Sequence, residues 1–432
     1  MEILLLLFTF FWMYMFNINI VMINFMNFFL LLKLLTKFSV LDWWDLNFLF
    51  GLNIYSYGLM ILSMMILSVI LLNLKDLKCV SLILVMFVVM ILNFLSMNLL
   101  LYYFMFESSL IMIYYLIMGW SHSIFKMFAS YMLIFYTLMF SLPMLLIIIM
   151  ISKYWDSLSF LILEMSNITL SNFLVIYLMF GFLVKIPMFM LHSWLLKAHV
   201  EAPYFGSMIL ASIMLKLGGY GLLRVLLMFN ESFFLKNYLI LFNMMGALVM
   251  SIFCLQQIDM KLLIAISSVV HMGLMISSMY TLGGFGIKGG FMIMLAHGFS
   301  SSGLFYLVNE IYKNSKTRLI SLNKGVMMFM PVMTMMWFLL CTSNSAAPLS
   351  INLFSEVFML SSLIYFWSGI LGFLLLYCFF SFMYSIYLFS SVQHGFNEIC
   401  VYYFFSGKLI GYFSSMYHWI PLNLGFLFLM II

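Results

Sequence analysis

Long apolar stretches recur throughout this chain. Residues 59–72 and 142–151, for example, contain no charged residue and do not alternate apolar with polar side chains. A bilayer core of about 30 Å takes about 20 helical residues per crossing. Because lipid offers backbone groups no hydrogen-bond partner, crossing segments must be helices or strands of a closed barrel, and barrel strands alternate. The stretches therefore predict transmembrane helices.

The charge content leads to the same conclusion. Only 7% of the 432 residues are charged and 66% are hydrophobic, whereas about a quarter of a soluble domain is charged. So few charges cannot cover a water-soluble surface, and most of the surface must therefore face lipid. The formal net charge of +5 indicates an unequal distribution of charged residues between the loops and not a nucleic-acid-binding surface. We therefore expect no nucleic acid among the partners.

Polar residues divide the chain into candidate helices. We expect an all-α, polytopic membrane bundle of about 14 transmembrane helices, forming a single integral membrane domain over residues 1–432. Two segments contain Pro187 and Pro348. Proline disfavours a continuous helix, so each of these segments predicts a pair of half-helices around a break. The expected helices lie near residues 2–16, 19–36, 54–73, 79–96, 98–118, 127–151, 171–199, 206–228, 238–254, 260–279, 286–311, 325–363, 367–391 and 411–430.

The cysteines form no pattern that binds a metal or a cluster. They are scattered along the chain without a C-x-x-C pair or a neighbouring histidine cluster, at Cys79, Cys254, Cys341, Cys378 and Cys400. Haem, iron–sulfur and zinc sites need ligands at characteristic close spacings. The sequence also has no glycine-rich nucleotide-binding loop. We therefore expect this chain to hold no cofactor.

Six titratable residues remain inside the apolar stretches once the loop charges are set aside. They are Glu107, Lys185, Lys216, His271, His297 and Glu356. A lysine or an acidic residue at the centre of a membrane helix costs about 2.5–3.5 kcal/mol on the insertion scale. Such residues usually face a polar interior and mark an ion or proton path. The sequence therefore predicts that these six side chains mark an ion or proton path.

The six residues follow a similar arrangement in the two halves of the chain. Glu107 lies on an intact segment, and Lys185 follows 78 residues later beside the first break. His271 lies on an intact segment, and Glu356 follows 85 residues later beside the second break. Inverted-repeat transporters place their ion sites at helix breaks near the middle of the membrane. The arrangement favours an antiporter-like fold with inverted repeats.

Structural roles are open for the same residues. Glu107 and Lys185 could form an ion pair that only locks two helices. His271 and His297 could be neutral histidines satisfied by a carbonyl or a hydroxyl. Glu356 could cap the helix that begins at its own break. Among the other aromatic and histidine residues, we expect interfacial anchors at His192, Trp194 and His199 and loop or interface positions at His122, His394 and His418.

Several motifs are similar to those of one known family. They are K-I-P-M-F-M-L-H-S-W-L-L-K-A-H-V-E-A-P at 185–203, F-E-S-S at 106–109, Q-Q-I-D-M-K-L-L-I-A-I-S-S-V-V-H-M-G at 256–273, A-H-G-F-S-S-S-G at 296–303 and A-P-L-S-I-N-L-F-S-E at 347–356. Through these motifs, the chain from about residue 40 onward resembles the chain 4 family of mitochondrial NADH–ubiquinone oxidoreductase. Members of this family are antiporter-like membrane subunits of respiratory complex I.

The resemblance implies a function. It implies a translocase subunit that couples electron transfer from NADH to ubiquinone to proton pumping across the inner mitochondrial membrane. Flavin, iron–sulfur clusters and ubiquinone would then be handled by partner subunits. The implied partners are other membrane-arm subunits of complex I, including neighbouring antiporter-like chains, together with lipids. The implied location is the inner mitochondrial membrane, crossed many times.

The resemblance also gives each of the six residues a position in the family's proton route. In chain order these positions are the helix-5 carboxylate at Glu107, the helix-7 lysine paired with it at Lys185, the central-axis lysine of helix 8 at Lys216, the relay positions of helices 10 and 11 at His271 and His297, and the terminal residue of helix 12 at Glu356. The sequence departs from the family's pattern at Met112, where a proline is usual.

Two other functions are open at this point. The same fold serves subunits of multisubunit cation/proton antiporters, and the six residues do not exclude sodium as the transported ion. A purely structural membrane subunit with an idle channel is the other alternative. Neighbouring genes, or co-purification with iron–sulfur subunits, would separate complex I from an antiporter complex.

Overall fold

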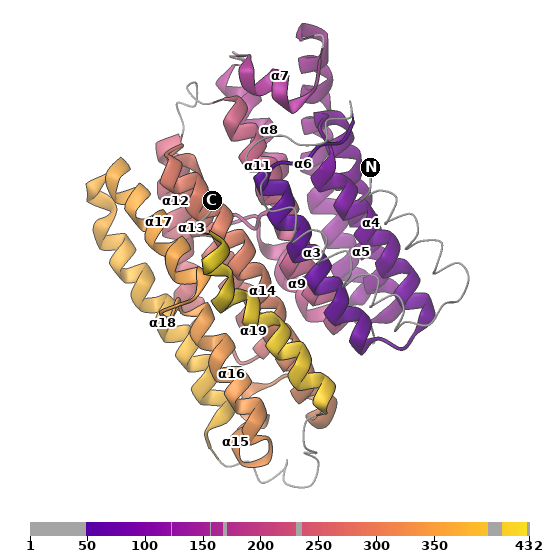
Figure 1. Ribbon diagram of the computed structural model, residues 1–432, viewed down its shortest axis with the longest axis vertical. Coiled ribbons are helices and arrows are strands. Elements are labelled where there is room, and N and C mark those ends of the chain that lie inside the picture. The colour runs from indigo at the N-terminus through magenta and orange to yellow at the C-terminus, as the bar shows by residue number, and fades with distance from the viewer. Residues whose placement is uncertain are drawn as a thin grey trace. The chain divides into compact units, whose positions relative to one another are not determined.

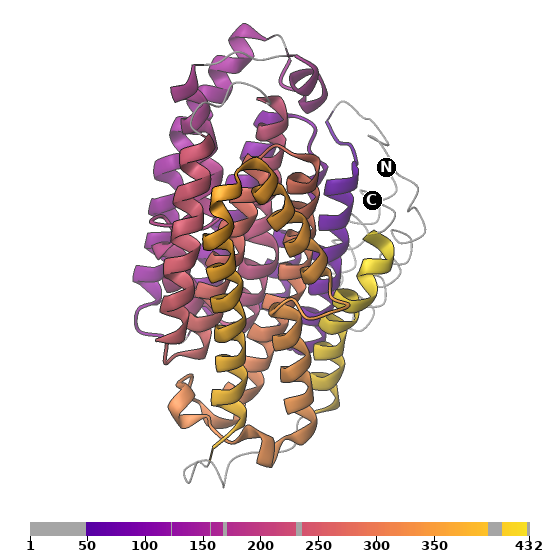
Figure 2. The same ribbon diagram turned by 90° about the vertical axis from the view of Figure 1, so that its left-hand side faces the viewer.

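The fold is helical wherever the chain is described. The computed structural model describes residues 49–121, 123–155, 157–166, 171–229, 236–395 and 408–429. Within these ranges the chain forms helices joined by short connections, and extended pairing is limited to isolated β-bridges (Figures 1 and 2). Nine of the described helices are long and apolar enough to cross a membrane. The all-α membrane fold is thus confirmed. The helices expected at 2–16 and 19–36 lie outside the described residues, and the total of about 14 stays a prediction.

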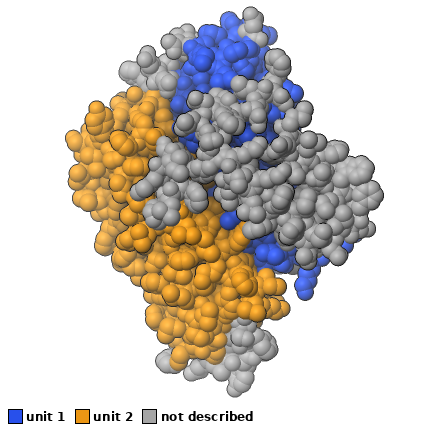
Figure 3. All heavy atoms as spheres, viewed as in Figure 1, with its two compact units in different colours: residues 1–185, 201–206, 213–232 blue, residues 186–200, 207–212, 233–432 orange. Residues whose placement is uncertain are grey.

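The Cα positions group the chain into two compact units, coloured in Figure 3. Unit 1 comprises residues 1–185, 201–206 and 213–232, and unit 2 comprises residues 186–200, 207–212 and 233–432. The expectation of one membrane domain over the whole chain therefore stays a prediction.

Unit 1 is built around a buried helix. Its helices are α3 (Ile54–Asn73), α4 (Leu77–Leu95), α5 (Leu99–Trp120), α6 (Lys126–Tyr154), the short α7 (Phe160–Met165), α8 (Asn172–Lys185) and α11 (Leu215–Met228). Helix α11 is buried along almost its whole length and packs on α8, α7 and α4. A Cβ atom added at Gly221 would lie 2.3 Å from Phe182 and 2.9 Å from the Tyr102 hydroxyl. Glycine is therefore required where α11 approaches its neighbours.

Unit 2 is centred on two long buried helices, α13 and α14. Helix α14 packs on α13, α16, α17 and α19, while α12 packs on α13 and α18. The helices lying wholly in unit 2 are α12 (Lys236–Leu255), α13 (Met260–Tyr280), α14 (Gly284–Ser315), α15 (Val326–Phe329), α16 (Pro331–Asn344), α17 (Ile351–Phe366), α18 (Leu371–Gln393) and α19 (Leu409–Leu429), with single 3₁₀ turns at Ile320–Leu322 and Ser368–Ile370.

Both predicted helix breaks are present. Helix α8 ends at Lys185, and α9 (Ser193–Glu201) begins after an irregular segment that contains Pro187. Helix α16 ends at Asn344 and α17 begins at Ile351, on either side of Pro348. In this second break, Ala346 and Leu349 have φ values of 57° and 69°, in the left-handed region.

Three local features differ from the sequence prediction. The segment expected as one helix over 206–228 consists of α10 (Tyr204–Ile209), a π-helical turn (Leu210–Met214) and α11. The connection between α6 and α8 contains α7, which the sequence analysis missed because six residues give no clear period. Pro331 begins α16 and separates it from α15, since proline is favoured at the first position of a helix.

Candidate functional site

The first part of the candidate site is a buried ion pair in unit 1. The Lys185 ammonium nitrogen lies 3.7 Å from Oε1 of Glu107, and the two side chains are 3% and 14% exposed. Lys185 also donates a hydrogen bond of 2.7 Å to the Phe106 carbonyl. The structure thus pairs the two oppositely charged residues that the sequence predicted. Because 3.7 Å exceeds a direct hydrogen bond, the pair is held by charge attraction and by the carbonyl.

The helices explain how this pair is placed. Glu107 lies in the middle of α5, which is unbroken and has methionine, not a helix-breaking proline, at position 112. Lys185 is the last residue of α8, just before the break. The C-terminal end of a helix carries partial negative charge and favours a cation there. Phe106 on α5 and Phe182 on α8 pack with ring centroids 5.5 Å apart, which holds the two helices together beside the pair.

Lys216 is also in unit 1 and is completely buried. It is the second residue of α11, directly after the π-helical turn, and α11 packs on α8, the helix that carries Lys185. The Tyr102 hydroxyl on α5 donates a hydrogen bond to the carbonyl of Leu217, the residue after Lys216. Tyr102 therefore connects the helix of Glu107 to the start of the helix of Lys216.

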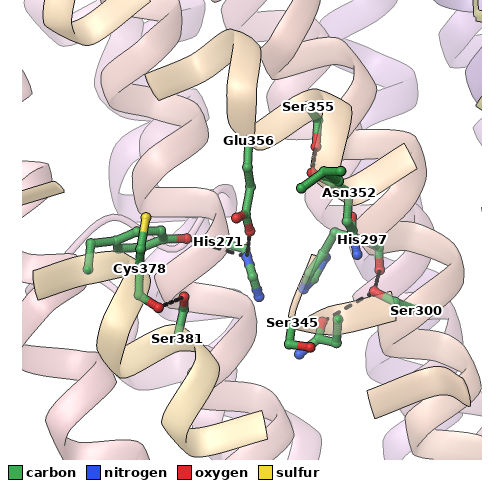
Figure 4. A network of polar contacts seen from close by, with 12 residues as sticks. His271, His297, Ser300, Ser345, Asn352, Ser355, Glu356, Cys378 and Ser381 are labelled. Carbon is green, nitrogen blue, oxygen red and sulfur yellow. Dashed lines mark hydrogen bonds and ion pairs between the residues drawn. The ribbon is translucent and has the colours of Figure 1, made fainter. Parts of the chain in front are cut away.

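The second part of the candidate site is a cluster in unit 2. Nδ1 of His271 on α13 lies 3.8 Å from Oε1 of Glu356 on α17, and the two side chains are 1% and 11% exposed. The His271 and His297 ring centroids are 5.6 Å apart. Figure 4 shows the Glu356 carboxylate directed at the His271 ring, with the His297 ring nearby. The structure therefore brings together the three residues that were predicted in this half.

Two tyrosines complete the cluster, and the sequence analysis missed both. The Tyr384 hydroxyl lies 2.9 Å from Nε2 of His271, and the Tyr377 hydroxyl lies 3.4 Å from its Nδ1. Both tyrosines are on α18 and are buried. Seven residues are about two helical turns, which places both tyrosines on one face of α18, but no feature of the sequence marked that face.

The second helix break is held by side chains around it. The Asn352 amide donates a 2.6 Å hydrogen bond to the Ser343 carbonyl, which joins α17 to α16 across the break. The Ser350 hydroxyl accepts a hydrogen bond from the Leu353 amide and caps α17. Glu356 lies one turn further along and is directed at His271, so the alternative that Glu356 caps this helix is wrong.

Some of the remaining predictions about histidine and tryptophan residues were wrong. Trp194 and His199 are 2% and 0% exposed, and the His199 ring stacks on Phe305 at 4.7 Å, so neither side chain is an interfacial anchor. His418 is buried within α19, where its Nδ1 lies 2.7 Å from the Ser414 carbonyl. Sequence alone did not show the packing that covers these rings. His394 is exposed just after α18, as expected, and His122 lies outside the described residues.

Unit 1 contains a second ion pair that the sequence analysis did not select. The Arg224 guanidinium on α11 donates a 3.0 Å hydrogen bond to Glu164 on α7 and another of 3.0 Å to the Tyr220 hydroxyl. The side chains of Arg224 and Glu164 are 2% and 22% exposed. Burial raises the pKa of Glu164 above its ordinary value, and the charge of Arg224 opposes that shift. This pair attaches α7 to the buried helix of unit 1.

The described residues contain no group of three or more His, Cys, Asp or Glu side chains that could hold a metal ion. Four cysteines are described, and all four are free thiols. The absence of any cofactor from the chain stays a prediction.

Comparisons with known proteins agree with these observations. Residues 96–386 match the family model described as NADH:quinone oxidoreductase/Mrp antiporter, transmembrane. NADH-ubiquinone oxidoreductase chain 4 of Apis mellifera ligustica is 46% identical over 417 residues, which cover 95% of this chain and 92% of that protein. The same chain of Ceratitis capitata is 41% identical over 395 residues, covering 88% and 87%.

Solved structures share the fold at low sequence identity. A chain of respiratory complex I from Thermus thermophilus with bound NADH superposes with a TM-score of 0.88 at 19% identity, covering 97% of this chain and 93% of that one. A chain of the Mrp complex from a Dietzia species superposes with a TM-score of 0.80 at 14% identity, covering 91% and 79%. The sequence identity to the chain 4 proteins of two animals, over nearly the full length of each, shows that the chain belongs to the NADH–ubiquinone oxidoreductase chain 4 family.

Proposed function

We propose that the six buried titratable residues are the proton-transfer groups of this chain. As a member of the chain 4 family, the chain is a proton-translocating subunit of complex I and a multi-pass protein of the inner mitochondrial membrane. The proposal concerns which side chains perform the translocation. In unit 1 they are Glu107, Lys185 and Lys216, and in unit 2 they are His271, His297 and Glu356.

The observation that carries this proposal is the Glu107–Lys185 pair. Two unit charges about 4 Å apart attract by about 4 kcal/mol at the effective dielectric constant of 20 that describes protein sites. Lys185 also donates a hydrogen bond to the Phe106 carbonyl. Moving the carboxylate away, or screening its charge, would therefore favour release of the Lys185 proton, and its return would favour uptake. A distant event that displaces Glu107 could switch Lys185 between the two states.

In unit 2 a proton would pass between His297, His271 and Glu356. The His271–Glu356 distance of 3.8 Å is slightly too long for direct transfer, and a small movement or one bridging water would close it. The separation of the two histidine rings, 5.6 Å between centroids, also calls for water or movement. Glu356 lies just beyond an unwound segment, which survives at membrane depth only beside protein or water. That position suits the end of a proton route.

The redox chemistry would take place on other subunits. We propose that flavin, iron–sulfur clusters and ubiquinone are bound by partner subunits of complex I, and that this chain contributes only proton transfer. The chain would lie among other membrane-arm subunits, with neighbouring antiporter-like chains beside it and lipid along its exposed apolar faces. We also propose that the two units work together as a single membrane domain.

A complex I subunit and a subunit of a cation/proton antiporter are not equally supported. The likeness to an Mrp complex chain concerns the fold alone, at 14% identity, whereas the identity to chain 4 proteins reaches 46%. Membership of the chain 4 family favours complex I over a free-standing antiporter. Replacing sodium by choline in a pumping assay would test the remaining question of the transported ion, and unchanged pumping is expected.

The central test uses Lys185→Met and Glu107→Gln in the assembled complex, reconstituted into liposomes. We expect both variants to lower the number of protons pumped per NADH oxidised, because each removes one charge of the pair. Lys153→Met is the matched control, since Lys153 is an exposed lysine in the last turn of α6. Fewer assembled complexes with normal pumping per complex would instead identify the pair as a structural ion pair.

A further inference from the structure

Two tyrosines of α18 place one hydroxyl group beside each ring nitrogen of His271. Tyr384 lies 2.9 Å from Nε2, within ordinary hydrogen-bond distance, while Tyr377 lies 3.4 Å from Nδ1, near the outer limit. The Glu356 carboxylate lies on the same side of the ring as Tyr377, 3.8 Å from Nδ1. The two sides of the imidazole therefore face different chemistry: a carboxylate and a phenol near the outer limit of hydrogen bonding at Nδ1, and a phenol at ordinary hydrogen-bond distance at Nε2.

This asymmetry decides where the proton of a neutral imidazole lies. A neutral histidine has one N–H donor and one nitrogen that only accepts. An ionised carboxylate accepts but cannot donate, so it is stabilised by an N–H on the nitrogen that faces it. A tyrosine hydroxyl can donate to the nitrogen lone pair. With the proton on Nδ1, His271 presents its N–H towards Glu356 and accepts from Tyr384. With the proton on Nε2, a lone pair would face the carboxylate.

We propose that Tyr384 positions neutral His271 in the Nδ1–H tautomer, facing Glu356, and passes the next proton to Nε2. The proposal rests on the proposed function and adds the direction of one step. Transfer to Glu356 breaks the Nδ1–H bond and forms an O–H bond on the carboxylate. In the same step the Tyr384 hydroxyl beside Nε2 gives its proton to that nitrogen, and the phenol oxygen takes one proton from the translocation route. The imidazole and the phenol therefore both stay neutral, and the imidazole then carries its proton on Nε2. Protons would therefore enter His271 on the Tyr384 side and leave on the Glu356 side.

The structure of α18 makes this arrangement rigid. Tyr384 is 1% exposed and Tyr377 is 0% exposed, so both rings are fixed by packing, and α18 packs directly on α13, the helix of His271. A buried hydroxyl that lost its partner would pay the cost of desolvation. The hydroxyl of Tyr384 therefore stays at Nε2, and a ring flip of His271 would have to break this hydrogen bond.

The test combines pumping with a spectroscopic signature of the tautomer. Complex I labelled with ring-¹⁵N histidine would be measured by redox-induced infrared difference spectroscopy, and His271→Gln would assign the bands of this residue. The resting wild-type complex should show the Nδ1–H signature. Tyr384→Phe should reduce the preference for this tautomer roughly fivefold, the ratio that one hydrogen bond of typical strength sustains, and should lower protons pumped per NADH. Tyr387→Phe, on the same helix, should change neither.

The outcomes separate this proposal from the proposed function. If Glu356→Gln abolishes pumping while Tyr384→Phe keeps both the wild-type tautomer and normal pumping, the positioning role is refuted and the proton route stands. If Glu356→Gln pumps normally, the proposed route itself fails, whatever the tautomer. An Nε2–H signature in the resting wild-type complex, before NADH is added, that is lost in His271→Gln would overturn the positioning role even where the Tyr384→Phe complex does not assemble.

Discussion

The buried Glu164–Arg224 pair allows a sharp prediction about stability, because its two partners are buried to different extents. Glu164→Ala leaves a guanidinium that is 2% exposed without its carboxylate, and removing one partner of a buried pair costs about 3–5 kcal/mol. Arg224→Met leaves instead a carboxylate that is 22% exposed. The raised pKa of Glu164 also lets it take up a proton and become neutral. We therefore expect Arg224→Met to lower the stability by less than Glu164→Ala does, by about 1–3 kcal/mol.

The double variant Glu164→Ala/Arg224→Met should lose less stability than the summed losses of the two single variants, because no buried charge is left without its partner. The measurement is the temperature at which half of the purified complex loses its mobility on native gels. Lys313→Met is the control, since Lys313 pairs with Glu310 while 47% exposed and such pairs contribute only about 0.2–1 kcal/mol. The reasoning would be refuted if Arg224→Met lowered this temperature as much as Glu164→Ala or more. It would also be refuted if the effect of the double variant equalled the sum of the two single effects.

Three further predictions concern packing, capping and composition. Gly221→Ala should lower the thermal midpoint of the complex, because the Cβ atom of the alanine would lie 2.3 Å from Phe182 and overpacking costs about 1–3 kcal/mol. Gly372→Ala is the control and should leave the midpoint unchanged, because the space around Gly372 is open. Ser350→Ala should destabilise the start of α17 by about 1 kcal/mol, seen as faster hydrogen exchange of the Leu353 amide, while Ser361→Ala on the exposed side of that helix leaves the rate unchanged. Metal analysis of the isolated subunit should find no stoichiometric iron, and a bound cluster would contradict the cofactor prediction.

Local sequence information was sufficient for most of the described membrane helices and for the breaks at Pro187 and Pro348. The segment expected at 54–73 is α3 with the same bounds, because polar residues end an apolar run wherever the chain leaves the membrane. Pro187 and Pro348 gave the positions of the breaks because the restriction that proline places on the backbone is local. The cost of burying charge identified Glu107 and Lys185 as partners before any distance was known.

Long-range packing decided what the sequence could not show. Arg224 lies 60 residues from Glu164, and nothing in either local pattern indicates that a short connecting helix returns to cover α11. Tyr377 and Tyr384 were passed over because tyrosine is common in membrane helices, and only the position of His271 distinguishes them from lipid-facing aromatic residues. Burial of His418 likewise depends on a neighbouring helix.

The left-handed backbone of the second break has a consequence for which substitutions this gene can accept. Ala346 and Leu349 adopt positive φ values, which cost about 1–2 kcal/mol for a residue with a Cβ atom. Glycine at either position would remove this cost, whereas valine or isoleucine would increase it. On the lipid-facing surface, by contrast, leucine, isoleucine, valine and methionine should interchange with little effect. We expect single-nucleotide changes from leucine to valine or isoleucine to be nearly neutral there and harmful at Leu349, although hydrophobicity is the same in both places.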